Sequence, residues 1–449
     1  MDTPIYDFAK AYQSAAPARL HMPGHKGRGP LGCEGLDLTE ITGADSLFEA
    51  SGIIALSEQN ASRLFGCPTL YSTEGSSLCI RAMVRLSCLW AELQGRAPLI
   101  LAARNVHKTF LSAAALLDVP VQWLWDREAS YLSASVDLIE LSQALETYRP
   151  TAVYLTSPDY LGNLADLASV CALCHRHGAL VLVDNAHGAY LRFTSPSLHP
   201  MDLGADLCCD SAHKTLPALT GAAYLHLSAS LPEPVLHAAK EAMALFASTS
   251  PSYLILASLD LTNPALEALP CALQSFLPSL DRVCADLRAA GYCVSRPEPM
   301  KLTIRPKSRG YTGLQLAALL EKASIFPEFA DPDYLVLMPS PHNTAQELEA
   351  LVRVLCSLAP GAPLEDAPPA RARPVKAMSI RRAMLSVADT LPASDCLGRI
   401  LALPCVACPP AVPILMCGEV IDEAALAAFS YYGIRTLRVV RQNDFSPNT

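Results

Sequence analysis

Lys214 stands in a turn rich in Ser, His and Thr, within LCCDSAHKTLPALTGAAYL, and an apolar strand is predicted on each side of it. A lysine held in such a turn can be desolvated, which lowers the pKa of its amine and makes the amine nucleophilic. Asp184 ends the apolar run ALVLVD, so we expect a strand to carry this carboxylate at its C-terminal tip. Lys214 is therefore a candidate for Schiff-base chemistry, and Asp184 is a candidate partner for a cationic ring nitrogen.

Two further segments carry groups suited to the same chemistry. The turn STEGSS, residues 72–77, opens a predicted helix, and the backbone N–H groups at a helix N-terminus favour a phosphate. RNVHKT, residues 104–109, places His107 just after a predicted strand. A Schiff-base lysine, a carboxylate for a pyridinium and a phosphate turn are together what pyridoxal 5′-phosphate (PLP) requires. Asp184 would keep the ring nitrogen protonated, so that the ring accepts electrons from the substrate α-carbon.

The candidate residues are positioned by strands and helices that alternate regularly along the chain. Short apolar runs at 98–103, 121–125, 152–156, 179–183, 205–209 and 222–227 alternate with amphipathic helical segments, one of them predicted over 163–177. Nearly continuous apolar strands alternating with helices predict an α/β fold with a mainly parallel sheet covered on both faces. In such a sheet ligands bind at the C-terminal ends of the strands, where the candidate residues are expected.

Composition changes along the chain predict the domains. Residues 1–50, rich in Gly, Pro and charge, predict an arm of turns, and residues 51–260 the large PLP-binding domain. Residues 261–358 predict a smaller α/β domain. The Pro-rich residues 359–374 predict a linker to a C-terminal module, residues 375–449.

The composition excludes several classes of protein. The chain has 449 residues, of which 51% are hydrophobic and 17% are charged, and this predicts a large, well-buried globular protein. A net charge of −9 argues against nucleic acid as a partner. MDTPIYDFAK lacks the pattern of a signal peptide, and prolines interrupt the uncharged stretch 400–418. We therefore expect a cytoplasmic protein with no membrane segment and with reduced thiols.

The cysteine spacings do not predict a metal site. Cys171 and Cys174 precede His175 in a haem-attachment pattern, but they fall on one face of a predicted helix, as core thiols do. Cys405 and Cys408 are flanked by prolines and fit a rigid turn. We expect no bound metal.

Seven motifs together resemble the bacterial ornithine/lysine/arginine decarboxylase family, in its short form, among the fold-type-I PLP enzymes. They are HMPGHKG, DLTEITGADSLF, RNVHKT, VDNAHGAYL, DSAHKTLPALTGAAYLH, STSPSYLILASLD and CPPAVPILMCGEVI. The resemblance implies the PLP-dependent transferase fold, with a seven-stranded large sheet and a smaller α+β C-terminal domain. It also implies a homodimer or higher homo-oligomer with active sites shared between subunits.

The resemblance assigns roles to matching positions. Lys214 would hold the cofactor and Asp184 would pair with its ring nitrogen. Ala186 would pack on one ring face, His187 would lie near the phenolic oxygen, and His107 would stack on the other face and steer protonation. The phosphate would contact Gly75, Ser76, Ser77, Ser211 and His213. From the neighbouring subunit, it would contact Ser248, Thr249 and Ser250.

Three positions depart from the family pattern. Asn185 stands where the family has Glu, Glu74 stands where it has Asn, and Ala212 stands where it has Thr. A carboxylate beside a phosphate is electrostatically unfavourable, so we expect Glu74 to point away or to be protonated.

The implied reaction is α-decarboxylation of arginine, lysine or ornithine to the corresponding amine and CO2, as in polyamine biosynthesis. The distal cation of such a substrate needs an acidic group, for which Glu328, Asp331 and Asp45 are candidates. Sequence patterns do not choose among the three substrates, although analogy with the short branch favours arginine. Two alternatives remain: an aminotransferase, in which Arg305 would clamp the α-carboxylate, and an inactive PLP-binding relative. His107 argues against the former, and the intact Lys214 and Asp184 against the latter.

Overall fold

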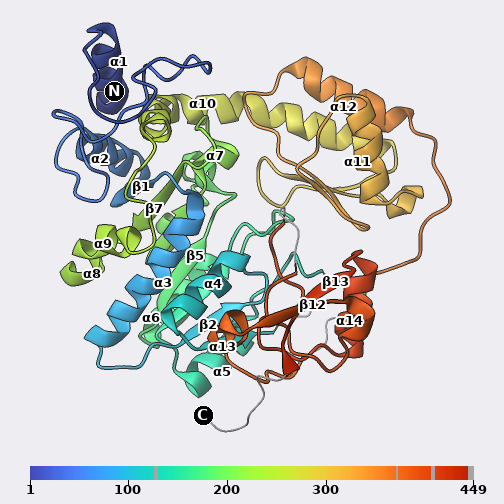
Figure 1. Ribbon diagram of the computed structural model, residues 1–449. Coiled ribbons are helices and arrows are strands. Elements are labelled where there is room, and N and C mark those ends of the chain that lie inside the picture. The colour runs from blue at the N-terminus through green and yellow to red at the C-terminus, as the bar shows by residue number, and fades with distance from the viewer. Residues whose placement is uncertain (126–129, 371–372, 406–409, 443–449) are drawn as a thin grey trace. The chain divides into compact units, whose positions relative to one another are not determined.

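The structure is a computed structural model that describes residues 1–125, 130–370, 373–405 and 410–442. Cys408, two linker residues and the C-terminal end of the predicted last module lie outside the described residues. The chain divides into two compact units (Figure 1). The first contains residues 1–100, 145–157 and 166–271, and the second contains residues 101–144, 158–165 and 272–449.

Seven short strands form the large sheet in the order β1-β7-β6-β5-β4-β2-β3. Their bounds are Thr69–Ser72 (β1), Ile100–Ala103 (β2), Val121–Leu124 (β3), Ala152–Thr156 (β4), Leu180–Asp184 (β5), Leu207–Asp210 (β6) and Ala223–Leu227 (β7). β5 pairs in parallel with β4 and β6, whereas β7 runs antiparallel to β6 and β1. Every residue of β2, β5, β6 and β7 is buried, as in a sheet covered on both faces. The predicted mainly parallel α/β sheet is confirmed.

Helices cover the strands of the first unit. α3 packs against β5, β6 and β7, and α6 packs against β5 (Figure 1). α6 begins at Leu167, later than the sequence predicts, because Asp166 caps it by accepting a hydrogen bond from the Ser169 N–H at 3.2 Å. The helices are Pro4–Ser14 (α1), Ile53–Phe65 (α2), Gly75–Leu93 (α3), Leu167–Arg176 (α6), Ala212–Thr215 (α7), Glu233–His237 (α8) and Ala239–Ala244 (α9). Two helices cross the boundary between the units: Leu138–Tyr148 (α5) and Tyr253–Ala289 (α10).

The N-terminal segment contains a docked helix that the sequence analysis does not predict. α1 begins at Pro4, where a missing N–H costs a helix nothing. The backbone N–H groups of Ile5 and Tyr6 donate to Oδ2 of Asp260 at 2.8 and 3.0 Å. Asp260 is fully buried, so these bonds hold the start of α1 against the first part of α10.

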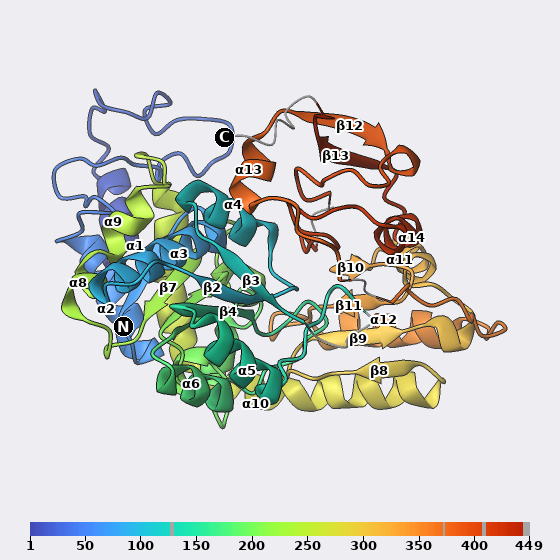
Figure 2. The ribbon, with the colours of Figure 1, turned by 90° about the horizontal axis from the view of Figure 1, so that it is seen from below.

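The second unit contains two smaller sheets. One has the order β10-β11-β9-β8 and is antiparallel, and the other pairs β12 with β13. Arg288, near the end of α10, donates to the carbonyl of Val294 in β8 at 3.0 Å, and the helix runs alongside that strand (Figure 2). The strands are Cys293–Ser295 (β8), Leu302–Arg305 (β9), Phe329–Ala330 (β10), Leu335–Leu337 (β11), Ala388–Pro392 (β12) and Thr436–Val440 (β13). The helices are Lys108–Leu117 (α4), Gly313–Lys322 (α11), Ala345–Ser357 (α12), Ile380–Leu385 (α13) and Glu423–Tyr431 (α14).

The C-terminal part of the second unit has its own apolar core, in which Leu401, Ile421, Phe429 and Leu437 are almost fully buried. The predicted smaller α+β part of the fold is therefore present. Among the helices in the described ranges, none is both long enough and apolar enough to span a membrane.

Candidate active site

Lys214 lies in α7, the short helix that follows β6 in the first unit. Its Nζ lies 2.9 Å from Nε2 of His187, in the turn after β5. The structure thus brings together two residues that the sequence places after neighbouring strands. Lys214 as a whole residue is exposed in the single chain, and its contact with His187 is partly buried. The desolvation of its amine stays a prediction.

Asp184 is the last residue of β5, as predicted, and lies beside Thr156 of β4 and Cys209 of β6 in the sheet register. Its carboxylate is buried and held from both sides. Oδ2 accepts a hydrogen bond from the Tyr154 hydroxyl at 3.2 Å, and Oδ1 accepts one from the Ala186 N–H at 3.2 Å. These bonds fix the direction in which the carboxylate points.

Sequence reasoning missed Tyr154. It lies in the middle of β4 and is fully buried, and burial raises the pKa of its hydroxyl well above the ordinary value. A buried tyrosine hydroxyl normally needs a hydrogen-bond partner. A tyrosine inside an apolar strand was therefore a signal that a buried partner exists, although the sequence does not name that partner.

The turn that opens α3 has an open space above it. Gly75 has φ +69°, its N–H donates to Gly221 O at 2.7 Å, and a Cβ placed on it would meet no atom within 4 Å. The side chain of Glu74 makes no capping bond to α3. The Ser211 hydroxyl donates to the Ser76 hydroxyl at 2.8 Å, which ties this turn to the loop that carries Lys214. The start of a long helix without a side-chain cap, beside open space, suits a phosphate.

His213 and Ser77 complete the predicted phosphate residues. Nδ1 of His213 lies 2.9 Å from the carbonyl of Ala222, and burial lowers the pKa of the His213 ring. That contact directs one ring nitrogen to the backbone. Ser77 is in the first turn of α3.

The side chain of Glu74 contacts Ser248, and its expected turn away from a phosphate stays a prediction. Its Oε1 accepts a hydrogen bond from the Ser248 N–H at 2.7 Å. Ser248 thus contacts the phosphate turn of its own chain. A contact of Ser248, Thr249 and Ser250 with a neighbouring subunit stays a prediction.

A buried polar cluster lies behind the sheet edge and accounts for Asn185. Nδ2 of Asn185 donates to Oδ1 of Asp210 at 2.6 Å, and Nε2 of His199 and of His226 each donate to Oδ2 at 3.0 Å. Burial alone would raise the pKa of Asp210, but the two histidines hold it well below the ordinary value. The family pattern has a Glu at position 185. In this chain the residue there is Asn185, whose amide donates to the carboxylate of Asp210.

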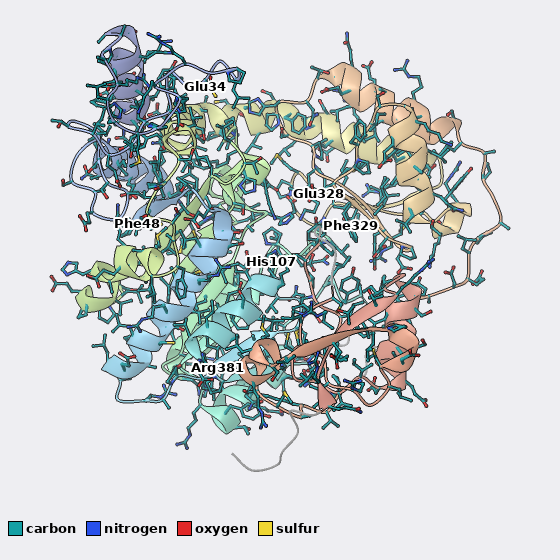
Figure 3. The ribbon with its side chains drawn as sticks, in the orientation of Figure 1. Glu34, Phe48, His107, Glu328, Phe329 and Arg381 are labelled. Carbon is teal, nitrogen blue, oxygen red and sulfur yellow. The ribbon has the colours of Figure 1, made fainter. Side chains whose placement is uncertain are left out.

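His107 belongs to the second unit, where it caps α4 (Figure 3). Nδ1 accepts a hydrogen bond from the Thr109 N–H at 3.2 Å, so the neutral ring carries its proton on Nε2. The next residue, Lys108, donates its N–H to Ala411 O at 2.8 Å. The stacking of His107 on a cofactor ring stays a prediction.

The three carboxylates proposed for the substrate's distal cation have different surroundings. Both oxygens of Asp45 accept backbone N–H bonds, including those of Ser51 at 3.1 Å and Gly52 at 2.8 Å, so this carboxylate closes the turn before α2. Glu328 accepts the Tyr160 hydroxyl at 2.7 Å. Asp331 is buried in the second unit. We retain Glu328 and Asp331 as candidates and leave Asp45 out.

Comparisons with known proteins agree with this geometry. Residues 3–271 match the family described as Orn/Lys/Arg decarboxylase, major domain. An arginine decarboxylase of Bacillus subtilis is 29% identical, over 94% of this chain and 92% of the relative. The uncharacterized protein YaaO of the same organism is 30% identical, over 96% of this chain and 94% of the relative. The solved lysine decarboxylase of Francisella novicida has the same fold, with a TM-score of 0.81 at 17% identity, over 98% of this chain and 81% of that chain.

The fold and the first unit's residues define a PLP-dependent decarboxylase of fold type I. The open turn at Gly75, the fixed carboxylate of Asp184 and the amine of Lys214 fit the phosphate, ring nitrogen and aldehyde of that cofactor. The chain belongs to the Orn/Lys/Arg decarboxylase family.

Proposed function

We propose that the protein removes the α-carboxylate of L-arginine as CO2 and releases the corresponding amine, agmatine. The observation that carries the PLP chemistry is the placement of the Lys214 amine 2.9 Å from His187, after β6 and after β5, the strand that ends in the buried Asp184. The family match supports decarboxylation. The name of the Bacillus subtilis relative supports arginine over lysine and ornithine.

Each candidate residue of the first unit would hold a different part of the cofactor. When bound, PLP supplies a conjugated ring that accepts the electron pair left by the departing CO2. Lys214 would hold the cofactor through Nζ and Asp184 would keep a proton on the ring nitrogen. Ala186 would lie against the ring, and His187 would lie near its oxygen. The start of α3, with Ser76, Ser77, Ser211 and His213, would hold the phosphate.

The carbon that loses CO2 must gain a proton. His107 carries its ring proton on Nε2, because Nδ1 accepts the Thr109 N–H. We propose that His107 steers this protonation, for which its ring must first take up a second proton and act as the imidazolium, and that Lys214 takes part in releasing the amine.

A product assay tests this function. The purified protein is incubated with PLP and an equimolar mixture of L-arginine, L-lysine and L-ornithine, and the amines are identified by mass. We expect agmatine as the dominant product. Cadaverine or putrescine as the dominant product would overturn the choice of substrate. No amine from a protein that shows the visible absorbance of bound PLP would overturn the reaction.

We expect Glu74→Gln to tighten PLP binding by about fivefold. The amide keeps an oxygen for the Ser248 N–H and removes a negative charge beside the phosphate turn. Two unit charges about 4 Å apart in water interact by about 1 kcal/mol, which corresponds to this factor. The dissociation constant is measured by titrating the apoenzyme with PLP, and the gain should shrink as salt is added.

Glu92→Gln is the matched control, because it removes the same charge from the exposed C-terminal end of α3. It should leave PLP affinity unchanged. Equal affinities for Glu74→Gln and the unsubstituted enzyme would contradict a phosphate at this turn.

We also propose that the protein acts in the cytoplasm, in polyamine biosynthesis, as a homodimer or larger homo-oligomer. Leu20, Met22 and Leu31 in the N-terminal segment are 95%, 69% and 82% exposed in the single chain, and such an apolar surface is suited to a second copy. Sedimentation equilibrium should give a mass at least twice that of one chain.

A further inference from the structure

Asp210 ends β6 as Asp184 ends β5, but the reaction scheme above gives Asp210 no role. Successive residues of a strand point to opposite faces of the sheet. The thiol of Cys209 lies 3.7 Å from Oδ1 of Asp184, so the side chain of Asp210 is on the other face. Asp210 is fully buried there. A buried carboxylate needs hydrogen-bond partners, and those partners show which segments it holds.

Two histidines hold one oxygen of Asp210. Nε2 of His199 and Nε2 of His226 each lie 3.0 Å from Oδ2, and both rings are fully buried. Nδ1 of His199 accepts the Met201 N–H at 3.3 Å, so the proton of the neutral ring is on Nε2 and is donated to Asp210. His199, Cys208 and Asp210 have possible metal-ligand atoms within 4.8 Å of one another, but Nε2 does not bind a metal while it carries that proton. The histidines therefore serve as donors that fix the carboxylate.

The other oxygen of Asp210 holds the turn that follows β5. Oδ1 accepts a hydrogen bond from Nδ2 of Asn185 at 2.6 Å. The amide of Asn185 fills the inside of the turn 185–188, because a Cβ placed on Gly188 would lie 2.0 Å from its Oδ1. The Gly188 N–H also donates to the backbone carbonyl of Asn185 at 2.7 Å. Ala186 and His187 lie within this turn, and the His187 ring is 2.9 Å from the candidate Schiff-base amine.

The same carboxylate lies at the start of the segment that carries the lysine. Asp210 directly precedes Ser211, whose hydroxyl donates to that of Ser76 at 2.8 Å, at the start of α3. Lys214 follows in α7. One buried side chain thus connects the turn after β5 with the segment after β6, and these two segments carry most of the candidate cofactor residues.

We propose that Asp210 is a positioning residue of the PLP site. Through Asn185 it fixes the turn 185–188 relative to the segment that carries Lys214. His199 and His226 keep it in place from the opposite side. The inference rests on the cofactor site of the proposed function and is independent of the choice of substrate. It also gives Asn185, which departs from the family pattern, a role in this chain.

Asp210→Asn tests the contact on both sides. Asn185 and the two histidines all donate, and an amide must turn its own N–H groups toward one of them. PLP binding, measured by titrating the apoenzyme, should weaken by about tenfold, as when a group that orients a metal ligand is removed. The visible circular dichroism per bound PLP, which depends on the orientation of the ring, should change. Lower stability in urea with both PLP readouts unchanged would mean a purely structural role and would overturn the proposal.

Exchanging the two side chains provides the rescue. In Asn185→Asp combined with Asp210→Asn, the amide at position 210 donates to the carboxylate at 185 and turns its oxygen to the histidines. The PLP dissociation constant should return to within about threefold of the original value, because residues in contact are coupled. The circular dichroism should return as well. A folded double variant that binds PLP no better than Asp210→Asn would overturn the proposal.

Asp206 supplies the matched control, because it directly precedes β6 and so lies at the other end of the same strand. Its Oδ2 lies 2.9 Å from Nε2 of His175 and accepts the Val181 N–H at 2.7 Å, and the residue is 6% exposed. Asp206→Asn should lower stability in urea and leave the affinity and circular dichroism of PLP unchanged. Equal losses of PLP affinity in Asp206→Asn and Asp210→Asn would overturn the proposal.

Asn185→Ala decides the matter if Asp210→Asn folds poorly, because it keeps Asp210 with both histidines and removes the link to the turn. It should weaken PLP binding severalfold and change the visible circular dichroism. Unchanged values of both would overturn the proposal. Because these readouts need no turnover, a protein that shows the expected effects and makes no amine would refute the proposed reaction alone.

Discussion

Lys214→Ala should lower kcat/KM for amine formation by at least about 10²–10⁴-fold, because it removes a group assigned both to hold the cofactor and to transfer protons. The variant should also lose the visible absorbance of lysine-bound PLP and release the cofactor on dialysis. Both readouts are independent of turnover. Lys214 is exposed, so in the cofactor-free protein the free energy of unfolding should change by less than about 0.5 kcal/mol.

Lys214→Arg is the matched control. It keeps a positive charge beside His187, but a guanidinium does not form the covalent bond to the cofactor. It should also lose the visible absorbance of lysine-bound PLP, and its activity should stay as low as that of the alanine variant. Amine formation at the unsubstituted rate in either variant would refute the role of Lys214.

The strands that position the active site were predictable from the sequence. The apolar run at 152–156 coincides with β4, and Asp184 ends β5 as expected, because short buried strands are continuous apolar runs that stop at the first charge. The helix that begins at Gly75 was also expected, whereas Lys214, expected in a turn, lies in the short helix α7. Local patterns thus placed the other groups on their elements.

Contacts between distant segments were not predictable. The carboxylate of Asp260 holds α1 across more than 250 residues of sequence, and nothing near Pro4 signals this partner. Tyr154 reaches Asp184 only because β4 and β5 are neighbours in register. A single sequence gives the type of a buried polar residue but not the partner that its burial requires.

Asp45 shows the opposite error. Asp45 was a candidate only because the substrate's distal cation needs an acidic group, yet its oxygens accept backbone N–H bonds from residues 46, 51, 52, 54 and 55. Burial opposes ionisation, and these bonds outweigh it, so the pKa of Asp45 falls below its ordinary value. Sequence does not distinguish a carboxylate that closes a turn from one that meets a ligand.

The second large effect is on stability, and it concerns a buried ion pair within the second unit. Nη1 and Nη2 of Arg104 donate to Oε1 and Oε2 of Glu419 at 2.7 and 2.8 Å, and the side chains are 4% and 3% exposed. Oε2 also accepts the Met416 N–H at 2.8 Å, and the guanidinium lies 4.4 Å from the Trp125 ring centre. Both Nη atoms of Arg104 and both carboxylate oxygens of Glu419 thus have partners within the protein.

Glu419→Ala should therefore lower the free energy of unfolding by about 3–5 kcal/mol, because it leaves the Arg104 charge buried without a counter-charge. The loss is measured by urea unfolding. Arg192 and Asp202 supply the control, since they form an Arg–carboxylate pair whose side chains are 26% and 29% exposed. Asp202→Ala should cost about 1 kcal/mol or less. If Glu419→Ala and Asp202→Ala lower the free energy of unfolding by similar amounts, burial does not set the cost of breaking the ion pair.

Replacing both partners with apolar residues removes the two charges and keeps the position filled. It therefore distinguishes the effect of an unpaired charge from the effect of lost packing. Arg104→Met combined with Glu419→Leu removes both charges, so it should recover a large part of the loss seen with Glu419→Ala. Arg104 lies three residues before His107 in the chain. If the pair also positions His107, the double variant should regain stability while kcat stays low. If the double variant regains both the free energy of unfolding and kcat, the ion pair contributes to stability alone.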